Sequence, residues 1–241
     1  MIDRSLNYGR PLVRRWLEAA RPFRTVLDIG AGEGADLAIA QAVEAAARRI
    51  AIEVWPPNVE RLRGAGAEVH QVDLERERLP LEDATIDVVI ANQILEHTKE
   101  IFWIFHEIAR VLRPGGRLIV GVPNLASLHN RLLLLAGRQP SVIKSASAHV
   151  RGYTRADLLG FLEQAAPGTF RLLDTGGANF YPLPPALARP AARLLPGMAW
   201  GLFLYLEKAG AYERQFLDFP TAARLETNFR TRAARPVREQ E

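Results

Sequence analysis

Short apolar runs alternate with amphipathic segments along the first half of the chain. Five of these runs have the length and composition of buried strands, at residues 25–29, 49–54, 69–72, 86–91 and 118–122. The fourth is continuously apolar, which is typical of a strand covered on both faces of a sheet. Because segments of helical periodicity separate the runs, the pattern predicts an α/β fold with a doubly wound, mainly parallel sheet and helices on both faces.

The clearest helix follows the fourth run. Apolar side chains recur at helical spacing from Ile101 to Leu112, and Pro114 with the two glycines after it ends the helix. Residues 35–48 and a segment that begins near Asn58, after two prolines, are expected to be helical as well.

Beyond Pro123 the pattern weakens, and the prolines between residues 182 and 196 predict irregular structure. The elements expected in this half are helices at 127–137 and after Thr154, strands at 170–173 and 202–206, and a polar loop at 139–152. We therefore expect one domain over residues 1–210, with a cofactor half at about 7–123 and an acceptor half at about 124–210. A basic C-terminal extension at 211–241 follows it.

Composition narrows the class of protein. The 241 residues are 48% hydrophobic and 24% charged, as in an ordinary globular protein, and the absence of cysteine excludes disulfides and thiolate chemistry. The longest apolar stretch, 194–206, contains a proline and two glycines and is shorter than the roughly 20 residues of a membrane span. We expect a soluble, cytoplasmic protein whose oligomeric state the sequence leaves open.

The net charge of +4 favours an anionic partner only weakly. No aromatic and basic residues interleave as a single-strand platform requires, so nucleic acid is disfavoured. The leucines of residues 182–208 suit an apolar lid, a dimer surface or a peripheral membrane patch for a lipid-linked acceptor. The favoured interpretation is that they complete the core and the last strand.

The strongest local feature is the segment VLDIGAGEG at residues 26–34. A strand that ends in glycines and opens a helix lets a ligand approach the backbone, here at Gly30, Ala31 and Gly32. The alternative is a tight turn with no ligand. The spacing G-x-G-x-G differs from the G-x-G-x-x-G of nicotinamide folds, and the carboxylate of Asp28 would repel a pyrophosphate. It suits S-adenosyl-L-methionine, which carries an ammonium group and a sulfonium.

Polar residues at the ends of the next strands extend this interpretation. Glu53 is placed to accept hydrogen bonds from the ribose hydroxyls, with Val54 beside the adenine. Asp73 and the backbone of Leu74 are expected at the adenine amino group. A surface acid and a turn cap are the alternatives for the two carboxylates.

Asn92 and Gln93 end the fourth strand, where their amides should face the cofactor, because ligands of such sheets bind at the carboxyl ends of the strands.

Together these segments resemble the class I S-adenosylmethionine-dependent methyltransferases, particularly the group that acts on small molecules and glycans. The resemblance runs from about residue 7 to 123 and rests on five motifs in order: VLDIGAGEG, IAIEV, HQVDLE, IDVVIANQILEH and VLRPGGRLIVGVPN. It implies a seven-stranded sheet with an antiparallel last strand and the cofactor roles given above. It says nothing about the acceptor.

Methyl transfer from a sulfonium requires alignment and exclusion of water, and a hydroxyl acceptor also requires a base. The candidates for catalysis are His149 and His97, with Glu96 and Tyr153 beside them. Small-RNA 2′-O-methyltransferases and some ubiquinone-pathway enzymes resemble this stretch and use it in a metal site, with an acid where this chain has the neutral Gln93. We therefore expect no metal.

The favoured function is transfer of a methyl group to an O or N atom of a small metabolite, lipid precursor or sugar. The alternatives are a catalytically silent protein that binds the cofactor or a partner, and a nicotinamide-dependent oxidoreductase, which the glycine spacing disfavours.

Overall fold

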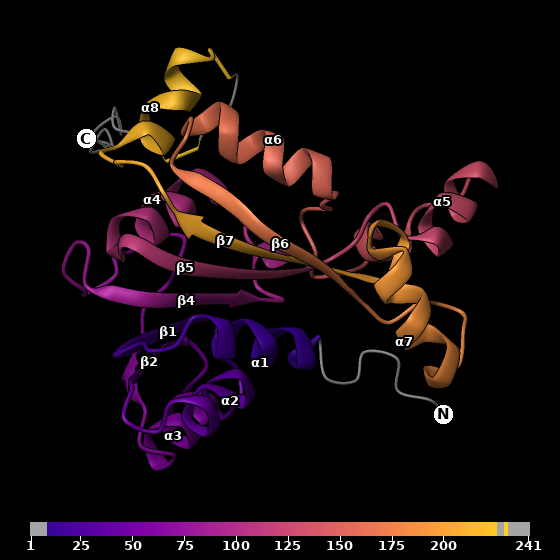
Figure 1. Ribbon diagram of the computed structural model, residues 1–241. Helices are drawn as coiled ribbons and strands as arrows, with labels where there is room; N and C mark the ends of the chain where they lie inside the picture. Colours follow the sequence, from indigo (N-terminus) through magenta and orange to yellow (C-terminus); the bar gives the residue numbers. More distant parts are fainter. Residues whose placement is uncertain (1–8, 226–228, 231–241) are drawn as a thin grey trace.

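The computed structural model describes residues 9–225 and 229–230. Within them, seven strands form one sheet in the order β3-β2-β1-β4-β5-β7-β6 (Figure 1). The strands are β1 Thr25–Ile29, β2 Arg48–Ile52, β3 Glu68–His70, β4 Ile86–Asn92, β5 Leu112–Pro123, β6 Phe170–Ala178 and β7 Gly201–Lys208. β7 runs antiparallel to β5 and β6, and the other neighbouring strands are parallel. The predicted fold class is confirmed.

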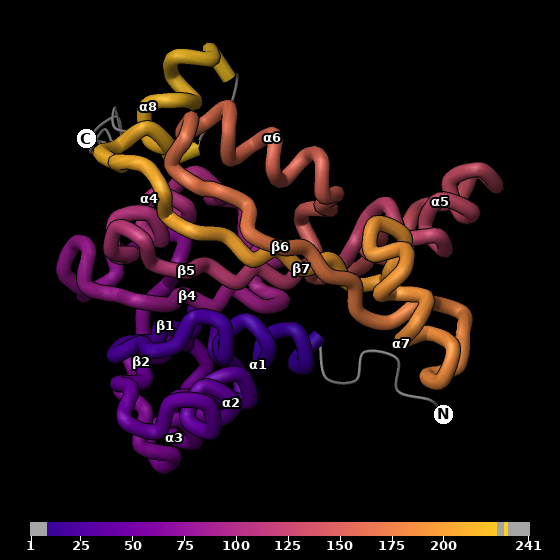
Figure 2. The backbone as a smooth tube through the Cα atoms, viewed as in Figure 1, coloured from indigo at the N-terminus to yellow at the C-terminus, as the bar shows by residue number. Residues whose placement is uncertain are grey.

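Helices cover both faces of this sheet (Figure 2). They are α1 Arg10–Ala19, α2 Ala35–Val43, α3 Pro56–Gly64, α4 Ile101–Val111, α5 Leu128–Leu135, α6 Arg155–Ala165, α7 Pro185–Leu194 and α8 Gln215–Ala222, with short 3-10 turns η1 Leu95–His97, η2 Ser141–Ile143 and η3 Pro196–Met198. Val26 of β1 belongs to a core cluster with residues of α1, α2 and α3, whereas its neighbour Leu27 belongs to another cluster, with residues of α4, α6 and α8. This alternation is the two-residue period of a strand.

The position of the site follows from the strand order. From β1 the chain moves outward through β2 to β3, and then returns to place β4 on the other side of β1. At such a switch point the helices leave in opposite directions, so a crevice opens at the carboxyl ends of the two central strands. The glycine loop after β1 and the residues after β4 border this crevice.

Several predicted elements differ from the observed ones. The helix after the glycine loop ends at Val43 rather than at residue 48, and β6 continues to Ala178 instead of ending at residue 173. Residues 185–194 form a helix, although the prolines predicted irregular structure. Pro185 stands in the first turn, where no hydrogen-bond donor is needed, and Pro190 is exposed, so water can reach the backbone that it leaves unpaired.

The first part of the expected C-terminal extension packs on the domain. Phe216 of α8 is fully buried and contacts the rings of Phe105 and Phe161, on α4 and α6. Most of the arginines that make the end of the chain basic lie outside the described residues. No helix in the described part of the chain has the length and hydropathy needed to cross a membrane.

Candidate active site

A cavity of about 720 Å³ lies at the carboxyl ends of the central strands. The predicted site residues that line it are Asp28, Gly30, Ala31, Gly32, Asn92, Gln93, His97 and His149. Those that do not line it are Glu53, Val54, Asp73 and Leu74. The structure thus brings the glycine loop, the end of β4 and both candidate catalytic histidines to one space.

The glycine loop requires its glycines for different reasons. Gly30 and Gly32 have φ values of 71° and 54°, in the left-handed region that side chains disfavour. A Cβ at Gly30 would also lie 2.6 Å from the side chain of Ile94. A Cβ at Gly32 would meet no protein atom within 4 Å, because this residue borders the open cavity. The backbone at Gly32 is therefore accessible to a ligand.

Two buried carboxylates lie on the cavity wall beside this loop. Asp28 is 3% exposed, and its pKa is raised well above the usual value by burial and by the charges of Asp36 and Glu53, although Arg10 lowers it. The pKa of Asp36 is also raised by burial, against hydrogen bonds from Asn92 and Arg10. The Arg10 Nε atom lies 3.4 Å from Asp36 Oδ1. A cationic ligand would relieve the repulsion between these acids.

Glu53 holds the loop from the neighbouring strand. One of its carboxylate oxygens accepts a hydrogen bond of 2.8 Å from the Gly32 N–H, and the other accepts bonds of 2.9 Å from the N–H groups of Val54 and Trp55. The side chains of Val54 and Trp55 are 54% and 60% exposed. Glu53 therefore connects the end of β2 to the ligand-approach side of the loop.

Asp73 and Leu74 lie further along the same edge. The carboxylate of Asp73 accepts a hydrogen bond of 2.9 Å from the Glu75 N–H, as in a turn cap, and its N–H donates to Glu77 at 2.9 Å. Leu74 is partly buried against the core. The contacts of Asp73 match the turn-cap alternative, and a role of either residue at the adenine remains a prediction.

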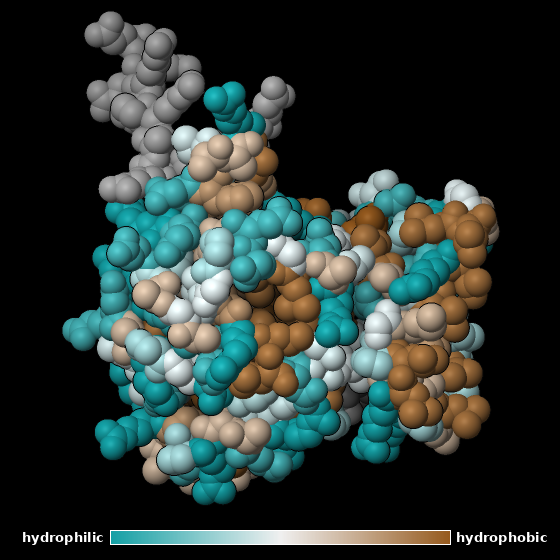
Figure 3. Space-filling view, turned by 45° about the horizontal axis from the view of Figure 1, so that its top comes forward, coloured by the Kyte–Doolittle hydropathy of each residue, from teal (hydrophilic) through white to brown (hydrophobic). Residues whose placement is uncertain are grey.

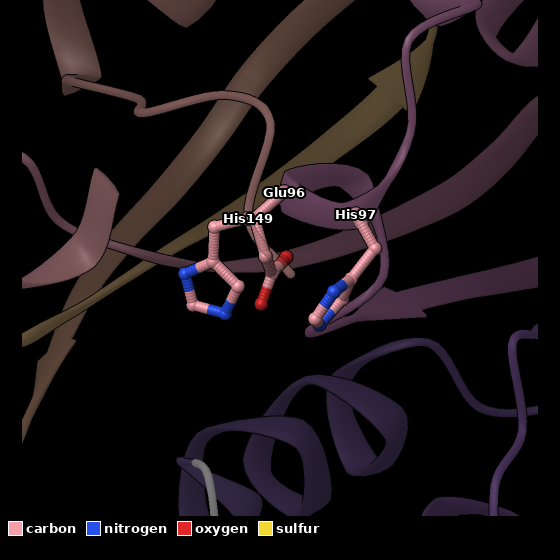
Figure 4. A group of neighbouring side chains, drawn as sticks. All are labelled: Glu96, His97 and His149. Carbon is pink, nitrogen blue, oxygen red and sulfur yellow. The ribbon is translucent and has the colours of Figure 1, made fainter. Parts of the chain in front are cut away.

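Glu96, His97 and His149 converge on the opposite wall of the cavity (Figure 4). The first two belong to η1, directly after β4. His149 comes from the loop after η2, and this loop is attached to η1 because Val150 N–H donates a hydrogen bond of 2.8 Å to the Glu96 carbonyl. The rings of the two histidines meet edge to face, with their centroids 4.8 Å apart. Tertiary contact thus joins residues about fifty positions apart.

The electrostatics of this cluster favour uncharged groups. Glu96 is 1% exposed, and burial raises its pKa to about 7. Its Oε2 atom has no hydrogen-bond partner among the described residues. Burial and the neighbouring His149 lower the pKa of His97. His149 Nδ1 lies 2.7 Å from the Val142 carbonyl oxygen, so a proton on Nδ1 leaves Nε2 as the acceptor.

Glu96, His97 and His149 could also hold a metal ion. Their potential ligand atoms lie within 4.8 Å of one another. One carboxylate and two imidazoles are a donor set known from catalytic zinc sites. Gln93, with a φ of 58°, adds only a neutral amide to the wall.

Tyr153 lies apart from this chemistry. It is buried, its hydroxyl donates a hydrogen bond of 3.2 Å to the Leu95 carbonyl, and its backbone bridges Asn124. It holds the start of α6 against η1 and does not line the cavity.

Sequence reasoning missed several cavity residues, namely Arg10, Glu33, Asp36, Ser141, Val142 and Trp200. An acid in the first turn of a helix, such as Asp36, is favoured by the helix dipole alone. The sequence therefore offers no reason to assign Asp36 to a ligand site. Arg10 and Trp200 lie far from the motifs in sequence and reach the cavity only through the fold.

Comparison with known proteins agrees with this geometry. Residues 27–120 match a family model described as a methyltransferase domain. A probable S-adenosylmethionine-dependent methyltransferase of Mycolicibacterium smegmatis is 34% identical over 64% of this chain and 54% of its own length. The 27-O-demethylrifamycin SV methyltransferase of Amycolatopsis mediterranei is 34% identical over 43% of this chain and 41% of its own. The chain spans about half the length, or less, of these relatives.

Solved structures share the fold at low sequence identity. The 1,6-didemethyltoxoflavin-N1-methyltransferase of Burkholderia thailandensis, with S-adenosylhomocysteine bound, has a TM-score of 0.56 at 20% identity, over 83% of this chain and 78% of that one. A methyltransferase of Archaeoglobus fulgidus has a TM-score of 0.56 at 15% identity, over 83% and 92%.

The sheet and the glycine loop define a Rossmann-like domain with a crevice at the carboxyl ends of β1 and β4. Residues 27–120 match a methyltransferase domain, and the chain is similar to S-adenosylmethionine-dependent methyltransferases, enzymes whose cofactor is S-adenosyl-L-methionine.

Proposed function

We propose that the chain binds S-adenosyl-L-methionine in the cavity and transfers its methyl group to an O or N atom of a small metabolite, lipid precursor or sugar. The observation that carries the proposal is the pair of buried acids, Asp28 and Asp36, beside a glycine loop whose backbone is open to the cavity. Buried carboxylates with raised pKa values match a ligand that carries an ammonium and a sulfonium, and oppose one that carries phosphates.

The same wall accounts for the parts of the cofactor. The ammonium group would lie toward Asp28, and the carboxylate toward the N–H groups at the start of α2. The carboxylate of Glu53 already accepts a hydrogen bond of 2.8 Å from the Gly32 N–H. On cofactor binding, the ribose hydroxyls would replace one of its backbone donors. Val54 would cover the adenine and Asp73 would approach its amino group. Asn92 and Gln93 would close the cavity from β4.

The chemistry needs one proton acceptor. A lone pair of the acceptor atom forms a bond to the methyl carbon while the carbon–sulfur bond breaks, and its electrons neutralise the sulfonium. The proton of the acceptor group then goes to a base. The lowered pKa of His97 keeps its imidazole neutral near pH 7, and His149 is positioned beside it. We assign the role of the base to this pair of histidines, and Glu96 is buried next to them.

The names of relatives support small acceptors of both kinds. The name of the Amycolatopsis relative describes methyl transfer to an oxygen of a demethylrifamycin. The name of the Burkholderia structural neighbour describes methyl transfer to a nitrogen of a didemethyltoxoflavin. A catalytically silent binding protein is the alternative, because the fold alone does not require catalysis.

Calorimetry on the full chain with S-adenosylhomocysteine and, separately, with NAD tests the proposal. We expect the first to bind and the second not to bind. Tight binding of NAD with no uptake of S-adenosylhomocysteine would overturn the cofactor assignment. Release of S-adenosylhomocysteine from S-adenosyl-L-methionine in the presence of pooled small-molecule acceptors then separates an enzyme from a silent binding protein.

A further inference from the structure

Helices α5 and α7 form a lobe at one end of the molecule, away from α4 and α8 (Figure 1). The lobe has a small core of its own, in which Ala188 and Ala192 of α7 pack with Phe180 and Ala199. Leu128 of α5 packs against this core. The remaining leucines of the two helices are therefore not needed to hold the lobe together.

Those leucines face solvent. The six that define the Leu/Arg face are Leu132, Leu134 and Leu135 at 56%, 56% and 85% exposure, and Leu187, Leu194 and Leu195 at 56%, 80% and 50%. The space-filling view shows apolar surface gathered over this lobe, with hydrophilic side chains among it (Figure 3). A concentration of large exposed apolar side chains marks an interaction surface.

The charge of the lobe has one sign. Residues 124–156 and 175–206 contain no Asp or Glu. Exposed arginines stand among the leucines of the face, namely Arg131, Arg138, Arg189 and Arg193. A partner that covers the face has to contact exposed leucines and arginines that have no acidic neighbours in these segments. The surface of such a partner is therefore both apolar and anionic.

We propose that the Leu/Arg face seats on the surface of a bilayer that contains anionic phospholipid. Leucines enter the boundary between headgroups and acyl chains, and arginines bind the phosphates. A second copy of this chain would set arginines against arginines, and a nucleic acid would leave the leucines in water. This inference rests on the proposed function, because it identifies the acceptor as a lipid-borne molecule.

Packed aromatic side chains connect the cavity to the helices that carry the face. Trp200 lines the cavity and lies 5.7 Å, centroid to centroid, from the ring of His129, on α5. Tyr181, just before α7, lies 4.5 Å from His129 and 5.8 Å from Trp200. This aromatic group links the cavity, through Trp200, to α5 and to the segment before α7. A polar headgroup in the cavity would therefore lie close to the face, and its acyl chains would stay in the bilayer.

Co-sedimentation of the full chain with vesicles tests the proposal. We expect the protein to pellet with phosphatidylcholine vesicles that contain phosphatidylglycerol, to bind pure phosphatidylcholine less, and to dissociate as salt is raised. The double variant Leu135→Ser/Leu194→Ser should lower the affinity at least about tenfold, because it removes two apolar anchors. Arg131→Gln/Arg193→Gln should lower it on the anionic vesicles alone.

Matched controls use exposed residues outside the face. Leu173→Ser/Leu225→Ser replaces two leucines that are each 40% exposed, and Arg14→Gln/Arg63→Gln replaces two exposed arginines of α1 and α3. Both controls should bind vesicles as the unsubstituted chain does. Binding that ignores the leucines of the face overturns the proposal. So does a dimer that the face variants dissociate while no vesicle binding occurs.

S-adenosylhomocysteine affinity, measured on the same samples, separates the two proposals. Cofactor binding without vesicle binding leaves the proposed function standing and refutes the membrane face. Vesicle binding without cofactor binding supports the membrane face and refutes the cofactor assignment. The inference of a lipid-borne acceptor then has no basis, because it rests on that assignment.

Discussion

The side-chain amide of Asn92 donates a hydrogen bond of 2.8 Å to the carboxylate of Asp36. This contact ties the carboxyl end of β4 to the first turn of α2, on either side of the β1 loop. Arg10 approaches the same carboxylate from α1 at 3.4 Å. One buried acid thus organises three elements around the cavity, and it does so next to Asp28, whose charge is not compensated to the same degree. We therefore expect a cationic group of the ligand to bind beside Asp28.

Replacing Asp28 by Asn should weaken binding of S-adenosyl-L-methionine by at least about tenfold, because it removes the charge that faces the ammonium group. The same substitution should raise the melting temperature of the free protein, since a buried carboxylate beside other acids costs free energy. Calorimetry and thermal unfolding measure the two effects. A variant that binds as tightly as the unsubstituted chain would place the ammonium elsewhere; Glu18→Gln, on the exposed face of α1, is the control.

Cofactor affinity should fall as the solution is acidified. The pKa values of Asp28 and Asp36 are raised in the free protein, and a bound cation lowers them, so binding releases protons. Affinity therefore increases as pH rises through the free-state pKa values and becomes constant above them. Titrations in two buffers of different ionisation enthalpy measure the released protons. Asp28→Asn should reduce that number, and proton uptake on binding would contradict the argument.

Glu96→Gln should stabilise the protein above pH 7. Burial raises the pKa of Glu96 from 4.5 to about 7, so the folded state holds a proton that the unfolded state releases between these values. Stability is then lost as pH rises from 4.5 to about 7, by up to about 3 kcal/mol. Denaturant unfolding at pH 5 and pH 8 should show a smaller difference for the variant than for the unsubstituted chain. An equal difference would mean that Glu96 does not hold this proton.

His97→Ala and His149→Ala should each lower kcat by roughly 10²-fold or more for a hydroxyl acceptor, since they remove the proposed base. The affinity for S-adenosylhomocysteine should change little by comparison. His70→Gln, in β3 outside the cavity, is the matched control and should keep full activity. Loss of cofactor binding in parallel with kcat would reassign the histidines to the cofactor site.

Treatment with EDTA should leave activity and cofactor affinity unchanged. The ligand atoms of Glu96, His97 and His149 lie within 4.8 Å of one another, but the neighbouring Gln93 offers a neutral amide, a poorer ligand for a hard divalent cation than a carboxylate. Protonation of Glu96 near pH 7 also competes with a cation. Loss of activity that Zn²⁺, Mn²⁺ or Mg²⁺ restores would turn the cluster into a metal site.

The fold could be predicted because its cause is local. The apolar runs around β1, β4 and β5 and the helical spacing of α4 encode a buried parallel sheet before any contact is known. Pro-rich residues 185–194 were predicted wrongly, because local propensity yields to tertiary packing where prolines fall at tolerated positions. Glycines of the β1 loop could be placed for the same local reason, since only they adopt its φ values freely.

Short-range patterns along the chain encode the parallel sheet, the glycine loop and the carboxylate of Asp28 beside it, because strand period, turn conformation and neighbouring charge are properties of adjacent residues. Three relationships depend on the three-dimensional packing: His149 meets His97, Asp36 and Arg10 line the same cavity as Asp28, and α5 and α7 share one small core. These relationships join residues from distant parts of the chain. Their positions depend on how the helices pack on the sheet, and no short-range pattern encodes that packing.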